Sequence, residues 1–185
     1  METQPFDLLV LGGGPAGQKA AIQGAKAQRR VLVVEQGAQV GGECVHRGTI
    51  PSKTLRETAM ALSGFRRRTA EVLELSLRED LRLESLLKRM DLVVKAHERY
   101  MAEQLKRNGI ECWHGGPLSL PPQEVEALEP GGNRRRARGE FVVIASGSRP
   151  RATRDVPVDH EHVLDSDSIL SMAYLPESLA VLGAG

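Results

Sequence analysis

The chain has 185 residues and a formal net charge of +1, with 25 Lys and Arg against 24 Asp and Glu. This length allows one full hydrophobic core and the beginning of a second domain. The balanced charge creates no field that favours nucleic acid or a membrane surface as a partner. The two cysteines, Cys44 and Cys112, exclude a disulfide scaffold and fit a reducing compartment.

The N-terminus also indicates the compartment, because residues 1–7 are acidic and contain no apolar signal region. No apolar run approaches the roughly 20 residues that a membrane span requires. His160 and His162 offer two metal ligands, but no further ligand cluster is near them, so we interpret this stretch as a connector. We therefore expect a cytoplasmic protein without a membrane, a nucleic acid or a metal as partner.

The first 35 residues predict a strand, a glycine turn, a helix and a second strand. The apolar run 7–11 predicts a buried parallel strand, and three glycines follow it. Pro15 comes next, in a place that suits the first turn of a helix, and this helix is expected to reach about residue 28. The apolar run 31–34 predicts the second strand. Together these elements make a βαβ unit.

Helical periodicity predicts two more helices, one from the segment 41–53 through residue 62 and one over 85–108, where Gly109 gives a stop. Residues 65–84 carry no motif. The remaining expectations are, in chain order, a strand at 110–113, an antiparallel meander over 118–141 with its tip at 131–133, a buried strand at 141–145, a connector over 149–178 and a strand at 179–182.

Four arginines gather in residues 134–138. Such a run can bind phosphates or nucleic acid when aromatic residues are interleaved with it. No aromatic residue is interleaved here, and the run lies beside the predicted hairpin tip. We therefore interpret it as a solvated loop.

Gly12, Gly14 and Gly17 have the spacing of a dinucleotide-binding fingerprint. The first glycine permits a tight turn, the second lets the backbone approach a diphosphate, and the third permits close packing of helix and strand. The alternative is a simple glycine turn, but a predicted strand precedes the motif and a predicted helix follows it. Glu35 lies about 20 residues further on, where an acid binds ribose hydroxyls. This acid fits the adenosine of either FAD or NAD.

Three further segments carry a family resemblance. The stretch from Gly41 to Lys53 reads GGECVHRGTIPSK, and residues 145–150 read ASGSRP. These resemble the redox-disulfide segment and the inter-domain junction of the pyridine nucleotide-disulfide oxidoreductase flavoproteins, which include dihydrolipoamide dehydrogenase and glutathione reductase. Residues 163–172 resemble the connector in the branch of that family that exchanges hydride between pyridine nucleotides.

The resemblance implies that the segment 41–53 lines the diphosphate and ring of FAD, which favours FAD over NAD as the bound cofactor. Lys53 is then the candidate catalytic residue, since the family places this ammonium near N5 of the flavin. Pro117 departs from the pattern, because it has no N–H to offer the adenine. The implied FAD-binding residues are Gly12, Gly14, Pro15, Ala16, Gly17, Glu35, Gln36, Gly41, Gly42, Cys44, Thr49, Ser52, Lys53, Pro117, Ala145, Ser146 and Gly147.

Thr49 stands where the disulfide-reducing members carry their second cysteine. Cys44 therefore has no local partner for a redox disulfide, and we interpret it as structural. The pattern is that of the hydride-exchanging branch, which implies an enzyme that passes hydride from NADPH through FAD to NAD⁺. Two alternatives remain: a flavoprotein similar to dihydrolipoamide dehydrogenase, and a truncated FAD-binding module without activity.

The resemblance also predicts the domain organisation, an α/β Rossmann-like FAD-binding domain with a parallel sheet, helices and an antiparallel meander. We expect this domain at 1–148, without its returning C-terminal segment. A connector at 149–178 and the truncated start of a second Rossmann domain, for NAD(P), at 179–185 are expected to follow. The intact relative is expected to be a homo-oligomer whose dimer domain is missing here.

Overall fold

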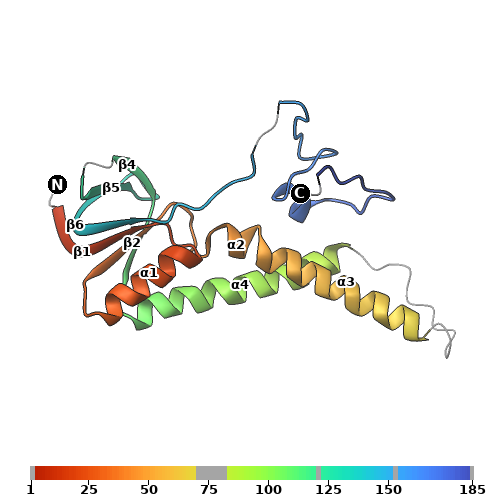
Figure 1. Ribbon diagram of the computed structural model, residues 1–185, viewed down its shortest axis with the longest axis horizontal. Helices are drawn as coiled ribbons and strands as arrows, with labels where there is room; N and C mark the ends of the chain where they lie inside the picture. The colour runs from red at the N-terminus through yellow and green to blue at the C-terminus, as the bar shows by residue number, and fades with distance from the viewer. Residues whose placement is uncertain (1–2, 70–82, 120–121, 152–153, 184–185) are drawn as a thin grey trace.

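The computed structural model describes residues 3–69, 83–119, 122–151 and 154–183. Its sheet has six strands in the order β3-β2-β1-β6-β5-β4 (Figure 1). The four strands from β3 to β6 in that order are parallel, and β5 and β4 continue the sheet in antiparallel pairing. The strands are β1 Thr3–Leu11, β2 Val31–Glu35, β3 Glu111–His114, β4 Gly116–Ser119, β5 Glu124–Leu128 and β6 Arg134–Ile144.

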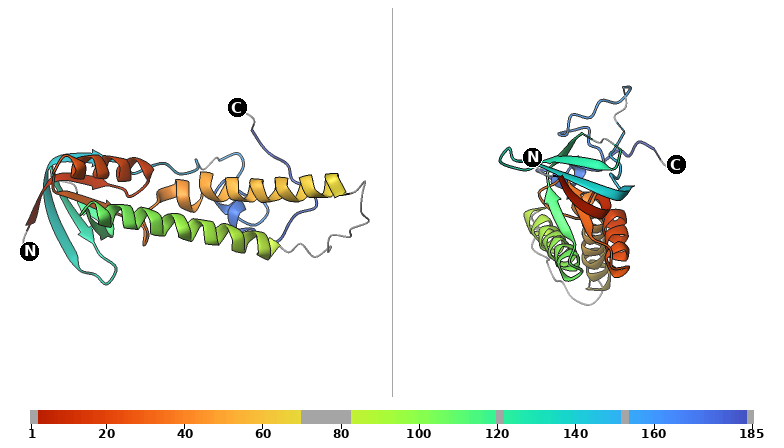
Figure 2. Two further views of the ribbon diagram at one scale, coloured as in Figure 1. Left: turned by 90° about the horizontal axis from the view of Figure 1, so that it is seen from below. Right: turned by 90° about the vertical axis from the view of Figure 1, so that its left-hand side faces the viewer.

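Two layers of side chains cover the two faces of the parallel strands, because consecutive residues of a strand point to opposite faces. Leu9, Leu32 and Trp113 belong to one buried cluster together with Val125 of β5, so the meander covers this face. Val10 and Val33 belong to a second cluster that includes Leu105 of α4. Figure 2 shows helices on that side and the meander strands on the other. The predicted α/β fold with an antiparallel meander is confirmed.

Four helices accompany the sheet: α1 Pro15–Lys26, α2 Gly42–His46, α3 Thr49–Thr69 and α4 Leu83–Arg107. α3 and α4 pack against each other as a long hairpin that extends well beyond the sheet (Figure 2). The predicted end of the first of these helices at residue 62 was too early, since α3 reaches Thr69. Most of the motif-free stretch 65–84 lies outside the described residues.

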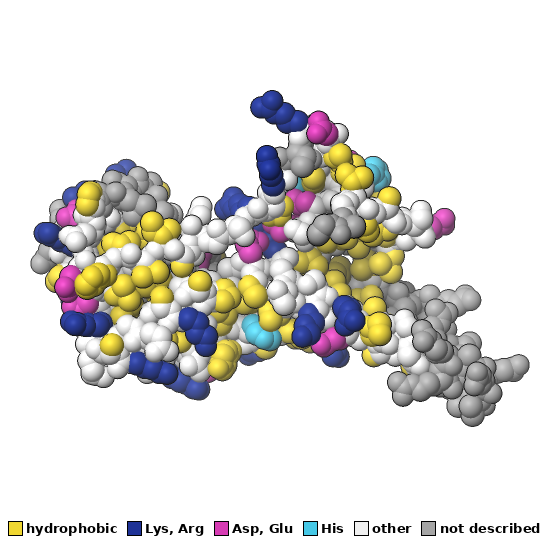
Figure 3. Space-filling model, viewed as in Figure 1, with side chains coloured by type: hydrophobic (Ala, Val, Ile, Leu, Met, Phe, Trp, Pro, Cys, Tyr) yellow, Lys and Arg dark blue, Asp and Glu magenta, His cyan; other side chains and the backbone are white. Residues whose placement is uncertain are grey.

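β6 is longer than the sequence predicted, because it joins the last strand of the meander and the buried strand into one element. It pairs in parallel with β1 from Arg136 to Ile144, and in antiparallel with β5 from Arg134 to Arg138. Its far half, from Phe141 onward, pairs with β1 and has no partner on its other side among the described strands. Phe141 is 63% exposed and Ile144 is 73% exposed, so this half forms an apolar edge. Figure 3 shows hydrophobic side chains gathered over this end of the molecule.

The arginine run is part of strand β6, so its interpretation as a solvated loop was wrong. Arg134 and Arg136 both donate to the carboxylate of Glu126 on β5, at 3.1 and 2.8 Å. Arg135 forms an ion pair with Glu111 at 3.1 Å and lies over the ring of Trp113. Within the described residues, these acids pair with three of the four arginines of the run.

After the end of β6, the described residues 149–151 and 154–183 lie outside the sheet and form irregular chain with one short 3₁₀ helix, Ser168–Ser171 (Figure 1). Asp165 organises the start of this helix, since its Oδ1 accepts from the backbone N–H of Asp167 and of Ser168. The strand predicted at 179–182 is wrong. No sheet hydrogen bonds are formed there, and Leu182 is 86% exposed, because no neighbouring strand is available to pair with it among the described residues.

Helix α1 packs on the sheet through a glycine contact. A Cβ on Gly17 would overlap the carbonyl oxygen of Gly12, and it would lie 3.2 Å from Cγ1 of Val10. Backbone atoms cannot move aside as a flexible side chain does. The third glycine of the fingerprint therefore permits the close approach of α1 to β1 that its spacing predicted.

We expect Gly17→Ala to destabilise the fold by about 3 kcal/mol, at the upper end of the cost of overpacking. At an unobstructed position inside a helix, the same change would stabilise by about 1 kcal/mol. Urea unfolding followed by circular dichroism measures the difference. Gly116→Ala, in strand β4, is the control for adding a Cβ without a clash, since nothing lies within 4 Å of the Cβ that it would add. A stabilised Gly17→Ala variant would contradict the contact.

Candidate functional site

A cleft of about 790 Å³ lies at the carboxyl ends of the parallel strands β1, β2 and β6. Strands β2 and β3 lie on one side of β1, and β6 lies on the other. In open α/β sheets such a point of diverging strand order is where ligands bind. The lining residues are Leu11, Gly12, Gly14, Pro15, Ala16, Val34, Glu35, Gln36, Gly37, Ala38, Gln39, Gly42, Glu43, Cys44, His46, Arg47, Glu98, Ala145, Ser146, Gly147, Ser148 and Arg149.

The wall of the cleft is formed by backbone at two places where chain segments approach closely. Gly12 has a φ of +107°, and a Cβ there would overlap the carbonyl oxygen of Ala145. Gly42 has a φ of +59°, and its Cβ would lie 3.0 Å from Cα of Gly14. Positive φ and the missing Cβ are both conditions that glycine meets without strain. The result is a wall that lets a ligand approach main-chain N–H groups.

Glu35 ends strand β2 and holds the fingerprint turn through its carboxylate. Its Oε2 accepts from the backbone N–H of Gly13 at 2.6 Å, and its Oε1 accepts from that of Gly37 at 2.7 Å. An ionised carboxylate has about four lone-pair directions, so each oxygen can accept one more hydrogen bond. The side chain is therefore fixed in place and still able to receive ligand hydroxyls.

The N-terminus of α1 opens onto the cleft. Gly14 occupies the cap position and no side chain caps the helix there. Pro15 takes the first helical position, where its missing N–H is not needed. Uncapped N–H groups and the positive end of the helix dipole favour an anion at this place.

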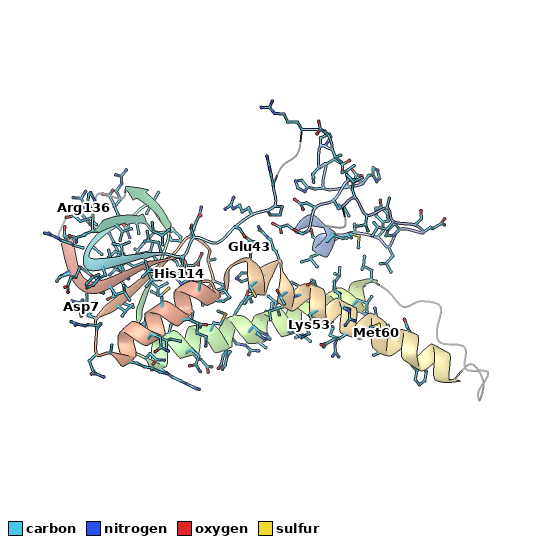
Figure 4. The ribbon with its side chains drawn as sticks, in the orientation of Figure 1. Asp7, Glu43, Lys53, Met60, His114 and Arg136 are labelled. Atoms are coloured by element: carbon cyan, nitrogen blue, oxygen red, sulfur yellow. The ribbon has the colours of Figure 1, made fainter. Side chains whose placement is uncertain are left out.

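The opposite side of the cleft is formed by α2 (Figure 4). The imidazole Nδ1 of His46 lies 3.2 Å from Oε1 of Glu98 and ties α2 to α4. Arg47 lies 3.6 Å from Glu43 and 3.9 Å from Asp167 of the connector. Oε2 of Glu43 is buried and has no hydrogen-bond partner, the one such side-chain atom found in the described residues. A buried acceptor without a donor is what a ligand O–H group would satisfy.

The cleft brings together most of the residues that the sequence predicted, from Gly12 to Gly147. Gly17 and Gly41 lie behind the wall; Gly41 donates its N–H to the carbonyl of Gly13 at 3.0 Å. The other predicted residues outside the lining are Thr49, Ser52 and Lys53. The side chain of Pro117, also predicted to bind FAD, lies outside the described part of the chain. Lys53 is exposed on α3, further along the hairpin than Glu43 (Figure 4).

Sequence reasoning missed several lining residues, among them Gly37, Glu43, His46 and Glu98. Gly37 and Glu43 are close in sequence to predicted positions, so a wider window around those motifs would have included them. Glu98 is different, because it is distant in sequence and reaches the cleft through the packing of α4. Helical periodicity alone gives no signal for that contact.

Both cysteines are free thiols. Cys44 lies on α2 and lines the cleft. Cys112 lies on β3, with its Sγ 3.8 Å from Nε2 of His114. Burial raises the pKa of the Cys112 thiol to about 11, and the nearby Glu35 carboxylate adds to the shift. Cys112 is therefore an S–H group at neutral pH.

Fold and cleft together define a dinucleotide-binding α/β domain. Comparison of the sequence with protein-family models identifies the family. Residues 6–185 match the model described as pyridine nucleotide-disulphide oxidoreductase, and the chain belongs to that family. This family uses FAD and pyridine nucleotides. The predicted family membership and Rossmann-like fold are both confirmed.

Similar proteins were found in bacteria. The chain is 38% identical over 182 residues to a soluble pyridine nucleotide transhydrogenase of Mycobacterium bovis, covering 97% of this chain and 39% of that relative. It is 35% identical over 190 residues to one of Pseudomonas putida, covering all of this chain and 40% of that relative. The chain thus spans about two-fifths of the length of these relatives. A crystal structure of LpdA from Mycobacterium tuberculosis has the same fold, with a TM-score of 0.80, 22% identity, and coverage of 95% of this chain and 38% of that one.

Two further observations concern the described residues alone. None of their helices is both long and apolar enough to cross a membrane. They also contain no group of three or more His, Cys, Asp or Glu side chains arranged to hold a metal ion. His162, one of the two histidines considered above, has its Nδ1 3.0 Å from the hydroxyl of Tyr174.

The raised pKa of Cys112 gives a prediction about alkylation. In a Cys44→Ala variant, iodoacetamide should react with Cys112 with a midpoint near pH 11, because the thiolate is the nucleophile. At pH 8 the rate should be about two-hundredfold below that of a free thiol, whose pKa is about 8.5, because the thiolate fraction falls by that factor. Unfolding in urea should restore the ordinary rate. A midpoint near the ordinary value in the folded protein would contradict the burial of this thiol.

Proposed function

We propose that the cleft binds FAD and that the chain is the FAD-binding part of a flavoprotein transhydrogenase. The observation that carries this proposal is the arrangement around Glu35: a fixed carboxylate, a glycine turn and an uncapped helix N-terminus face one cleft. The family, which uses FAD, supports it as well. The domain division follows as part of the proposal, with the FAD-binding domain at 1–148, a connector at 149–178 and the start of an NAD(P) domain at 179–185.

The cleft offers a separate partner for each chemical part of the dinucleotide. The diphosphate is bound at Gly12–Gly17, where backbone N–H groups and the helix dipole favour an anion. The adenosine ribose donates its hydroxyls to Glu35. The unpartnered Oε2 of Glu43 fits a further hydroxyl of the same molecule. Its anionic charge requires a hydroxyl there, since a phosphate oxygen would be repelled.

The flavin end is assigned to Cys44, Thr49, Ser52 and Lys53. FAD, when bound, supplies the capacity to accept and return a hydride. Lys53 contributes a positive charge that favours the electron-rich reduced ring. Cys44 takes no part in electron transfer, because Thr49 provides no second thiol and both cysteines of the chain are free.

The reaction proposed for the whole protein is hydride transfer from NADPH to NAD⁺, with both nucleotides using one pocket in turn. The names of the two transhydrogenase relatives support it. Thr49 argues against reduction of a disulfide substrate, since the thiol pair for that chemistry is absent. A cytoplasmic location and a homo-oligomer in the intact protein belong to the same proposal. The uncovered edge of β6 suits a further chain segment that closes the FAD-binding domain.

The role of Glu35 predicts a preference for FAD over FMN, because FMN has no adenosine ribose. Glu35→Ala should weaken FAD binding by about 1–3 kcal/mol, the cost of lost charge-assisted hydrogen bonds. Calorimetric titration of both flavins into the wild-type chain and the variant measures this. Binding of FMN should change less than binding of FAD, because FMN meets only the glycine turn that Glu35 also supports. Equal affinity of the wild-type chain for FAD and FMN would rule out the proposed role.

The proposed division of labour predicts that residues 1–185 alone do not exchange hydride. Reduction of thionicotinamide-NAD by NADPH should not exceed that of a free-FAD control, because residues 1–185 contain only the start of the proposed NAD(P) domain. A chimera in which this chain replaces the matching 39% of the Mycobacterium bovis relative should turn over. It should fail to reduce lipoamide or glutathione disulfide and should form no thiolate–flavin charge-transfer band. Disulfide reduction by the chimera without hydride exchange would refute the proposed reaction.

A further inference from the structure

The turn that follows β2 is held by a residue distant in sequence. The backbone N–H of Gly37 donates to Oε1 of Glu35, and the carbonyl of Gly37 faces Nδ1 of His114 at 2.9 Å. His114 ends strand β3, 77 positions further along the chain. The residue after it, Gly115, donates its N–H to the carbonyl of Glu35 at 2.8 Å. The end of β3 therefore forms hydrogen bonds with both ends of the short turn, Glu35 and Gly37.

The ring of His114 must present an N–H at Nδ1, because a carbonyl oxygen can only accept. Its other nitrogen, Nε2, lies 3.8 Å from Sγ of Cys112. The raised pKa of Cys112 keeps its proton on sulfur at neutral pH, so the S–H group can donate to Nε2. An acceptor role at Nε2 places the ring proton on Nδ1. An S–H group of Cys112 at Nε2 is compatible with the tautomer that the Gly37 contact requires.

We propose that His114 is a positioning residue that fixes the Gln36–Gly37 turn and so keeps the Glu35 carboxylate aimed at the ribose of an adenosine diphosphate group. The hydrogen-bonded series runs from Cys112 through His114 and Gly37 to Glu35. His114 is outside the lining of the main cleft and touches no ligand position. It acts through the turn. This inference rests on the proposed binding of FAD through Glu35.

The location of His114 supports an indirect role. It lines a smaller depression of about 240 Å³ together with residues of α4, apart from the lining of the main cleft. Gln39 lines both hollows, so the segment after β2 forms the wall between them. A wall of exposed loop between two hollows has little packing of its own. The hydrogen bond from His114 of β3 to Gly37 restricts this segment to a single conformation.

The test compares His114→Leu, which removes the donor, with His114→Asn, whose side-chain amide can place an N–H near the position of Nδ1. Amide hydrogen exchange at Gly37, measured by NMR without ligand, should be about fivefold to tenfold faster in the Leu variant, the factor for one lost hydrogen bond. The Asn variant should recover most of the protection. His97→Leu is the matched control, since His97 is also partly buried and its Nδ1 contacts a carbonyl, that of Val93, within its own helix.

Flavin titrations then distinguish a positioning role of His114 from a general loss of structure in the His114→Leu variant. His114→Leu should weaken FAD binding about fivefold to tenfold and leave FMN binding unchanged, because FMN lacks the ribose that Glu35 receives. Unchanged exchange at Gly37 in the Leu variant, or an equal loss of affinity for FAD and FMN, would overturn the inference. If the wild-type chain binds FAD and His114→Leu binds it equally well, only the role of His114 fails. If the wild-type chain does not bind FAD, the proposed function fails first, and this inference with it.

Discussion

The site depends on one steric constraint, the backbone contact between the turn after β1 and its neighbours. Any side chain on Gly12 would strike the carbonyl of Ala145, and any on Gly17 would strike Gly12 itself. These contacts set the distance from α1 to the sheet and from β1 to the end of β6. They also determine the positions at which backbone N–H groups face the cleft. The other parts of the site, including the Glu35 carboxylate, are attached to a turn whose shape this constraint has already fixed.

Charge is divided within the cleft in a way that suits a ligand with several kinds of group. The uncapped start of α1 attracts an anion, while Glu35 and Glu43 repel one and attract hydroxyl donors. A dinucleotide with phosphates between two polyhydroxylated parts has this alternation. A simple phosphate or a single carboxylate ligand would leave at least one of the two acids without a partner. No single contact would select such a ligand. The order of the anion-binding helix end and the two hydroxyl-binding acids along the cleft would select it.

Much of this could be predicted from sequence because the motifs are local. Gly12, Pro15 and Glu35 lie within one βαβ unit, whose apolar runs and glycine spacing determine their relative positions. The predictions failed where the structure depends on strand pairing between residues that are far apart in the sequence. The strand expected at 179–182 has apolar residues but no neighbour among the described strands, and β6 joined two predicted elements because β1 pairs along its length. Glu98 reaches the cleft through the packing of α4, and His114 reaches the turn beside it through the pairing of β3, neither of which periodicity specifies.

The apolar far half of β6 has a consequence for the behaviour of this chain in solution. Its backbone groups on one side have no partner among the described strands, and Phe141 and Ile144 stand exposed beside them. No charged side chain interrupts residues 141–145. An edge of this kind is a template for pairing with another strand, which charged residues or proline ordinarily prevent. We therefore expect this edge to favour self-association of the polypeptide wherever no other strand pairs with it.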